Sequence, residues 1–293
     1  MPQHSDDSPD WRPLAAALVS ICLWSSAYVG IRAATRTISP GALALGRLLI
    51  GTILLGLLLL RRGAVRPTGR EVGLLCIAGL LWFGLYNVTL NTGERVVDAG
   101  TAAMVVNIAP LMIMALAAIF LKERLTSGLL LGGAVALAGV IVIGLATMSG
   151  HAPVWGVLLC VVATASSAGG VVAQKPALAR LSALQVTWTC CAIGALCCLP
   201  YAPTLVRDIR TASPVDIAWM SYLGVFPTSI AFTTWAYALA RGSASRLAAT
   251  AYLVPPITIG ISWLVLDEVP KTIAILGGAL CLIGVVFARR QPK

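Results

Sequence analysis

The sequence predicts an all-α membrane protein with ten transmembrane helices, arranged as two inverted repeats of five, and three observations lead to this fold class. Of the 293 residues, 58% are hydrophobic and only 11% are charged, whereas a soluble domain carries about 25% charged residues. Apolar runs of about 18 residues or more, each long enough to cross a bilayer, recur along the whole chain. Two of these regions also repeat each other, which is typical of secondary transporters.

The repeat joins residues 99–140 to residues 244–285 at a constant separation of 145 positions, as between Pro110 and Pro255. Both copies are almost wholly apolar, so the duplication lies within the membrane part. We expect a tail over residues 1–12, one repeat over 13–150 and a second over 151–293. Other matched pairs are Leu121 with Leu266, Glu123 with Glu268, Gly132-Gly133 with Gly277-Gly278, Gly139-Val140 with Gly284-Val285, and Ala99 and Ala103 with Ala244 and Ala248.

Each expected span has close to the ~20 residues that cross the hydrocarbon core. The first follows an acidic tail and no convincing cleavage site follows it, so we interpret it as a retained helix and not as a signal peptide. Short links with turn-forming residues, such as Ser39-Pro40 and Ser213-Pro214, separate the spans. The ten ranges are 13–32, 40–60, 71–92, 99–121, 127–147, 153–174, 183–202, 215–239, 245–266 and 271–288.

Charge distribution orients the spans. With a cytoplasmic N-terminus, fourteen of the 21 basic residues fall in inside segments, six fall outside, and Arg47 lies within a span. Positive residues favour the cytoplasmic side, so both termini are predicted to be cytoplasmic and the protein to be multi-pass in the plasma or inner membrane. Because each half has an odd number of spans, the second half enters the membrane upside down. The outside residues are Arg32, Arg36, Arg95, Arg207, Arg210 and Lys271.

Composition argues against several other classes. The net charge of +10 comes from arginines in short loops, which fixes orientation and does not indicate nucleic acid. All eight cysteines fall in apolar spans, where we interpret them as small packing residues, and both histidines lie outside the spans. No phosphate-binding glycine loop is present. The sequence therefore predicts no cofactor, no metal site and no catalytic residues.

The order and spacing of several short motifs resemble the drug/metabolite transporter superfamily, in the type with ten helices and two EamA domains. The resemblance spans nearly the whole chain, although the second half has Ala165-Ser166-Ser167 where an aromatic like Trp24 would be, and its span 183–202 has no counterpart of Arg47. The motifs are residues 23–28 and 45–50, Ala99 to Pro110 leading to Leu121-Lys122-Glu123, Gly132-Gly133 to Gly139-Val140, and in the second half Pro255, Glu268, Gly277-Gly278 and Gly284.

Arg47 is the one charge clearly placed within a span, where burial costs roughly 3 kcal/mol on insertion scales. Such residues face the bundle interior and mark a pathway, so we expect Arg47 to contact a substrate carboxylate or a gate. An arginine bonded to free carbonyls, or one that reaches out to water, is the structural alternative.

Aromatic and amide side chains form the rest of the expected substrate site. They need partners or a cavity within the membrane, although interhelical bonding alone would also satisfy them. The resemblance implies that the first, third, fourth, sixth, eighth and ninth helices surround the cavity. The candidates are Trp24, Ser25, Tyr28, Trp82, Tyr86, Asn87, Asn91, Asn107, Ser166, Ser167, Trp235 and Tyr252.

Prolines, glycines and glutamates recur at matched positions. Pro110 and Pro255 are expected to act as hinges or to line the cavity, since proline removes a backbone donor. The glycines of spans 127–147 and 271–288 are expected to pack the halves together or to form a homodimer contact. We interpret Glu123 and Glu268 as structural.

These features predict a secondary transporter that moves small organic solutes by alternating access. The resemblance implies export of amino acids or related metabolites, while drug, sugar-nucleotide and lipid substrates stay open. The expected partners are a small-molecule substrate and membrane lipids. An integral membrane enzyme would need convergent acids, histidines or a metal, and a scaffold would be expected to carry a soluble domain; neither is indicated.

Overall fold

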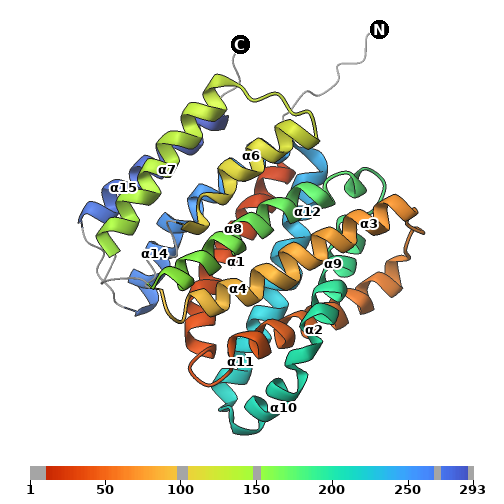
Figure 1. The fold of residues 1–293 in the computed structure, drawn as a ribbon. Helices are drawn as coiled ribbons and strands as arrows, with labels where there is room; N and C mark the ends of the chain where they lie inside the picture. Colours follow the sequence, from red (N-terminus) through yellow and green to blue (C-terminus); the bar gives the residue numbers. More distant parts are fainter. Residues whose placement is uncertain (1–10, 98–104, 148–152, 267–271, 290–293) are drawn as a thin grey trace.

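The computed structural model describes residues 11–97, 105–147, 153–266 and 272–289, and every regular element within them is helical (Figure 1). The elements are α1 (Arg12–Ala34), α2 (Pro40–Arg62), α3 (Gly69–Ala78), η1 (Gly79–Leu85), α4 (Tyr86–Gly93), α6 (Ala109–Phe120), α7 (Ser127–Thr147), α8 (Val154–Gln174), η2 (Ala177–Ala179), α9 (Ala183–Cys198), η3 (Leu199–Tyr201), α10 (Ala202–Thr211), α11 (Pro214–Leu223), η4 (Gly224–Ile230), α12 (Ala231–Arg241), α13 (Ala244–Thr250), η5 (Ala251–Leu253), α14 (Val254–Leu266) and α15 (Thr272–Arg289).

Helical segments occupy all ten ranges expected as spans, while the number that cross a bilayer stays a prediction. Two described helices, Ala109–Phe120 and Thr272–Ala288, are apolar but shorter than a full span. Six described stretches are long and apolar enough to cross a membrane: Pro40–Arg62, Gly69–Gly93, Ser127–Ala146, Val154–Ala179, Ala183–Thr211 and Pro214–Arg241.

Local sequence explains where several helices begin. Proline occupies the first position of α2 and of α11, where its missing N–H costs no hydrogen bond. The Ser213 hydroxyl accepts from the Asp216 N–H and donates to the Asp216 carboxylate, and Thr68 and Glu71 form the same capping box at α3.

Two long rods each contain a seven-residue π-helix in the middle. In one rod, η1 begins at Gly79 and joins α3 to α4; in the other, η4 begins at Gly224 and joins α11 to α12. The two π-helices are separated by 145 positions, which is the separation of the sequence repeat. The duplication therefore extends to segments whose side chains no longer match.

The π-helices contact the rest of the bundle in a reciprocal way. A Cβ atom on Gly79 would lie 2.7 Å from Ile193 Cβ and 2.9 Å from the Cys190 carbonyl oxygen, both on α9. A Cβ atom on Gly224 would lie 2.7 Å from Ile50 Cβ and 3.1 Å from the Arg47 carbonyl oxygen, both on α2. Each half thus packs its second helix on the π-helix of the other half, and Cys190 takes the place that corresponds to Arg47.

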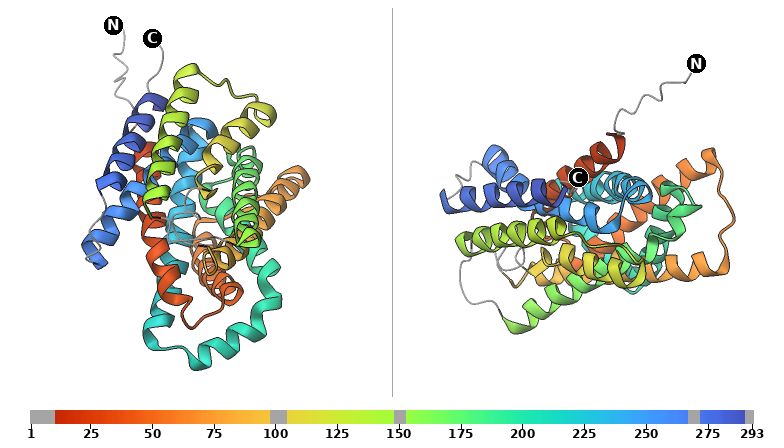
Figure 2. Two further views of the ribbon diagram at one scale, coloured as in Figure 1. Left: turned by 60° about the vertical axis from the view of Figure 1, so that its left-hand side comes forward. Right: turned by 90° about the horizontal axis from the view of Figure 1, so that it is seen from above.

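The repeat-related helices α7 and α15 run antiparallel and side by side (Figures 1 and 2). A Cβ atom on Gly139 would lie 2.5 Å from the Gly277 carbonyl oxygen, and one on Gly132 would lie 2.5 Å from that of Gly284. Because only glycine permits this backbone approach, these residues hold the halves together within one chain.

The first residues of α1 and the last of α15 lie at the same end of the bundle, which we call the proximal end; the opposite end is distal (Figure 2). Pro13 and Leu14 line a pocket with Arg246 of α13, and Ala288 packs against Ala249 of the same helix.

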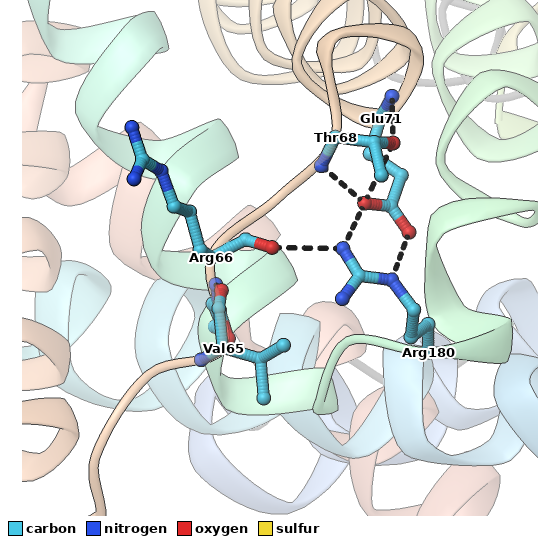
Figure 3. Close-up of polar contacts among 6 residues, drawn as sticks. Val65, Arg66, Thr68, Glu71 and Arg180 are labelled. Carbon is cyan, nitrogen blue, oxygen red and sulfur yellow. Dashed lines mark hydrogen bonds and ion pairs between the residues drawn. The ribbon is translucent and has the colours of Figure 1, made fainter.

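The α2–α3 link is tied to the second half at the proximal end (Figure 3). Arg180 donates to the Arg66 carbonyl at 2.9 Å and to the Glu71 carboxylate at 2.5 and 3.0 Å. Hydrogen bonding to this carboxylate raises the pKa of the Arg180 guanidinium. Gln185 adds two bonds to the Val65 backbone, at 2.6 and 3.1 Å.

Candidate functional site

Arg47 lies inside the protein, where α2 crosses η4. Arg47 is only 5% exposed, and its Nε donates a hydrogen bond to Thr228 Oγ1 at 2.9 Å. Close packing brings the two elements together, because a Cβ atom on Gly51 would lie only 3.0 Å from Thr228 Cγ2. The interaction joins the two halves, and Thr228 had no signal in the sequence.

Three further polar side chains lie in the region of Arg47. Tyr86 of α4 and Glu94, which follows that helix, lie within electrostatic range of the guanidinium, as does Cys191 of α9. Tyr28 of α1 lies within electrostatic range of Tyr86 and of Glu94. The two tyrosines and the glutamate are half-buried. We call Tyr28, Arg47, Tyr86 and Glu94 the polar cluster; it combines a guanidinium, a carboxylate and two phenols from α1, α2, α4 and the residue that follows α4.

An aromatic cluster lies one helical turn from the polar cluster, toward the proximal end. Trp24 precedes Tyr28 by four residues, and Trp82 precedes Tyr86 by four, so each pair shares a helix face. The contacting rings of the cluster have centroids 4.4 to 5.9 Å apart, which is close to the separation of favourable aromatic pairs. Its members are Trp24, Trp82, Phe83, Phe232 and Trp235.

Trp24 links the aromatic cluster to the same π-helix that holds Arg47. Its Nε1 donates to the Pro227 carbonyl at 3.3 Å, one residue before Thr228. Trp24 is half-buried, whereas Trp82 and Trp235 are 5% and 2% exposed. Two neighbouring residues of η4, Pro227 and Thr228, therefore hold the Trp24 and Arg47 side chains respectively.

The two asparagines of α4 make structural hydrogen bonds. Asn87 Nδ2 donates to the Phe83 carbonyl at 2.8 Å and to that of Trp82 at 3.3 Å, so it bonds to carbonyls of the wide π-helical turn. Asn91 Nδ2 donates to the Pro40 carbonyl at 3.2 Å and ties α4 to the start of α2, while its buried Oδ1 has no partner in the described residues.

The other expected site residues lie around the clusters or apart from them. Ser25 Oγ bonds to the Val254 carbonyl at 3.2 Å and so ties α1 to α14 beside Pro255. Ser167 Oγ bonds within α8, to the Thr164 carbonyl at 2.8 Å. Tyr252 packs with residues of α7 and α15, in a core separate from the aromatic cluster.

The matched prolines begin helices. Pro110 lies in the first turn of α6, after a turn at Asn107, which is 7% exposed. Pro255 is the second residue of α14, after the 3₁₀ turn η5. A break in the helix therefore precedes each proline, where the missing N–H is tolerated.

Sequence reasoning missed three contributors to these clusters. Thr228 and Phe232 looked like ordinary apolar-span residues, and Glu94 lies just beyond the range expected for the third span. The π-helix η4 brings two of them to the site, because it contains Thr228, and Phe232 lies two residues after it. A glycine at the start of η4 was the only available signal.

Comparison with known proteins identifies the family. The EamA-like transporter family matches residues 11–145 and 154–290. A relative from Streptantibioticus cattleyicolor, named "Probable terminal-alkyne amino-acid exporter", is 36% identical over 94% of this chain and 93% of its own length. "Uncharacterized transporter YdfC" of Bacillus subtilis is 32% identical over 91% of this chain and 87% of its own.

A more distant relative and a solved structure agree with this family assignment. "Probable amino-acid metabolite efflux pump" of Escherichia coli is 24% identical over 94% of this chain and 95% of its own. A solved crystal structure at 24% identity superposes with a TM-score of 0.77 over 94% of this chain and 96% of that chain, so the two share a fold. The chain belongs to the EamA-like transporter family and is a multi-pass membrane protein of the drug/metabolite type.

Proposed function

We propose that this member of the family exports amino acids or related small metabolites across the cytoplasmic membrane by alternating access. The observation that carries the proposal is the polar cluster beside the aromatic cluster, at the place where the two halves meet. Arg47 would bind the substrate carboxylate, and Glu94 would attract its ammonium group. The neighbouring tryptophans would contact an apolar side chain.

The names of two relatives support this substrate class. One is a "Probable terminal-alkyne amino-acid exporter" and the other a "Probable amino-acid metabolite efflux pump". An arginine guanidinium binds a planar carboxylate better than a lysine ammonium group does, because the guanidinium N–H groups form a fork that can bond both oxygens.

We also propose that the halves are inverted and exchange conformations during transport. The matched π-helices η1 and η4, the reciprocal glycine contacts and the antiparallel α7–α15 pair support this arrangement. With the proximal end in the cytoplasm, the polar cluster lies on the outer side of the aromatic cluster. The aromatic cluster would then close the path toward the cytoplasm.

The test is counterflow in proteoliposomes that contain the purified chain and unlabelled amino acids. We expect Arg47→Ala to reduce exchange of labelled amino acids at least about tenfold, since a charge-assisted contact contributes about 1.5–3 kcal/mol. Arg61→Ala, at an exposed position at the end of α2, is the matched control and should retain exchange.

Each other outcome overturns part of the proposal. Full exchange by Arg47→Ala, with correct insertion, would remove Arg47 from the site. If the wild-type chain exchanges drugs, sugar nucleotides or lipids but no amino acid, the substrate class is wrong. Absence of any exchange would favour a scaffold or enzyme role.

A further inference from the structure

A second pocket lies at the distal end, outside the polar and aromatic clusters. It has a volume of about 500 Å³ and lies between the start of α2, the end of α4, the start of α8 and the η3–α10 segment. Its lining combines two arginines, two aromatic rings and several hydroxyl groups. The residues used below are Ser39, Gly41, Arg95, Trp155, Tyr201 and Arg207.

Positive charge distinguishes this pocket. Arg95 and Arg207 come from segments more than a hundred residues apart and line the same space. Within the described part of the chain, the Arg95 guanidinium makes no hydrogen bond or ion pair. Arg207 contacts the Asp208 carboxylate at 3.3 Å and keeps 73% of its side chain exposed. Both guanidinium groups are therefore available to an anion.

The Asp208 carboxylate, next to Arg207 in the sequence, already has hydrogen-bond partners. Asp208 is 7% exposed, and it accepts from the Ser39 backbone N–H at 2.8 Å and from the Ser39 hydroxyl. Because the Ser39 hydroxyl is used in this way, it does not cap α2. The Tyr201 ring lies directly over Gly41 in the first turn of α2 and forms one wall.

The flank of the pocket is apolar and faces outward. Trp155 is 52% exposed at the start of α8, and Leu158 and Val161 continue the exposed face of that helix at 57% and 46%. On the other side, Leu199 and Val206 are 47% and 52% exposed. A tryptophan and a tyrosine above an apolar surface are typical of the headgroup level of a bilayer.

We propose that this pocket binds an anionic phospholipid, with its phosphate between Arg95 and Arg207 and its acyl chains along α8. Arginine is suited to phosphate because its fork of N–H groups matches the phosphate oxygens. With the proximal end in the cytoplasm, the two arginines lie on the outer side of the membrane, where the positive-inside bias predicts few basic residues. A bound anion would explain why two arginines line one pocket on that side.

Native mass spectrometry of protein released from nanodiscs tests this proposal without depending on transport. Nanodiscs would contain equal amounts of phosphatidylglycerol and phosphatidylcholine. We expect wild-type protein to retain phosphatidylglycerol selectively, and Arg95→Gln to lower its retention about tenfold, as expected for loss of a charge-assisted bond. The double variant Arg95→Gln/Arg207→Gln should lower it further.

Two controls separate the alternatives. Arg61→Gln/Arg62→Gln removes two exposed charges at the proximal end and should leave phosphatidylglycerol retention unchanged. An excess of inorganic phosphate should not displace the lipid, because it cannot use the apolar flank. Equal retention of both lipids, unchanged retention by Arg95→Gln, or displacement by inorganic phosphate would each overturn the phospholipid site. These results leave the proposed export function unaffected, since neither arginine belongs to the polar cluster.

Discussion

Arg47 Nε donates a hydrogen bond to Thr228 Oγ1 over 2.9 Å, and this bond links the second helix of the first half to the π-helix of the second half. Because Nε is engaged by Thr228, the two terminal nitrogens of the guanidinium can meet both oxygens of a carboxylate. Thr228, which is fully buried, is thus expected to position Arg47.

Thr228→Val removes the hydroxyl and keeps nearly the same volume. We expect KM for amino-acid exchange to rise about tenfold with little change in maximal rate, because a buried bond to a charged group contributes about 1.5–3 kcal/mol. Thr228→Ser should restore most of the affinity. Counterflow kinetics provides the measurement, and an unchanged KM in Thr228→Val would contradict the positioning role.

Glu123→Ala should destabilise the proximal end. The Glu123 carboxylate accepts from the N–H groups of Ala244 at 2.7 Å and Ser245 at 3.0 Å, and so caps α13 from the other half. Loss of a helix cap costs about 1 kcal/mol. We expect the free energy of unfolding, from reversible detergent titration, to fall by about that amount. Arg124→Gln, at an exposed neighbouring position, is the control, and equal stabilities would refute the capping role.

Gly139→Leu should disrupt the α7–α15 pair. A Cβ atom there would lie 2.5 Å from the Gly277 carbonyl oxygen, so the backbones must separate. Overpacking of this kind costs about 1–3 kcal/mol or more. The melting temperature in detergent should fall, whereas Gly73→Leu, where a Cβ atom meets nothing within 4 Å, should change it little. Similar melting temperatures for the two variants would contradict this contact.

Reporter fusions test the orientation. The start of α1 and the end of α15 both lie at the proximal end of the bundle (Figure 2). The distribution of basic residues predicts that this end is cytoplasmic. A fluorescent protein fused after Lys293 should therefore fluoresce, and alkaline phosphatase at the same place should be inactive. An active phosphatase fusion would reverse the orientation.

Much of the fold could be predicted because a bilayer imposes its thickness on the sequence. Apolar runs of about 20 residues marked the helical segments, and matched prolines and glycines revealed the duplication. The buried position of Arg47 also followed from the sequence alone. The repeat of the π-helices did not, since Gly79 and Gly224 begin segments whose other side chains differ in size and polarity.

The rotation of each helix about its own axis could not be predicted from the sequence. A membrane helix is apolar on nearly every side, so no polar face marks the side that points inward. Tyr252 thus appeared equivalent to Trp235, yet it packs against α7 and α15 while Trp235 joins the aromatic cluster. Asn87 and Asn91 appeared free to line a cavity, yet they bond to backbone carbonyls.

The sequence by itself determined the helical class, the positions of the apolar segments, the duplication and the family, because hydrophobic length and repeated motifs are properties of the chain. Only the tertiary structure decided that Thr228 holds Arg47, that Cys190 occupies the corresponding place in the other half, and that Arg95 and Arg207 share one pocket. These relationships join residues more than a hundred positions apart. They depend on close packing at glycines and on the wide turns of two π-helices.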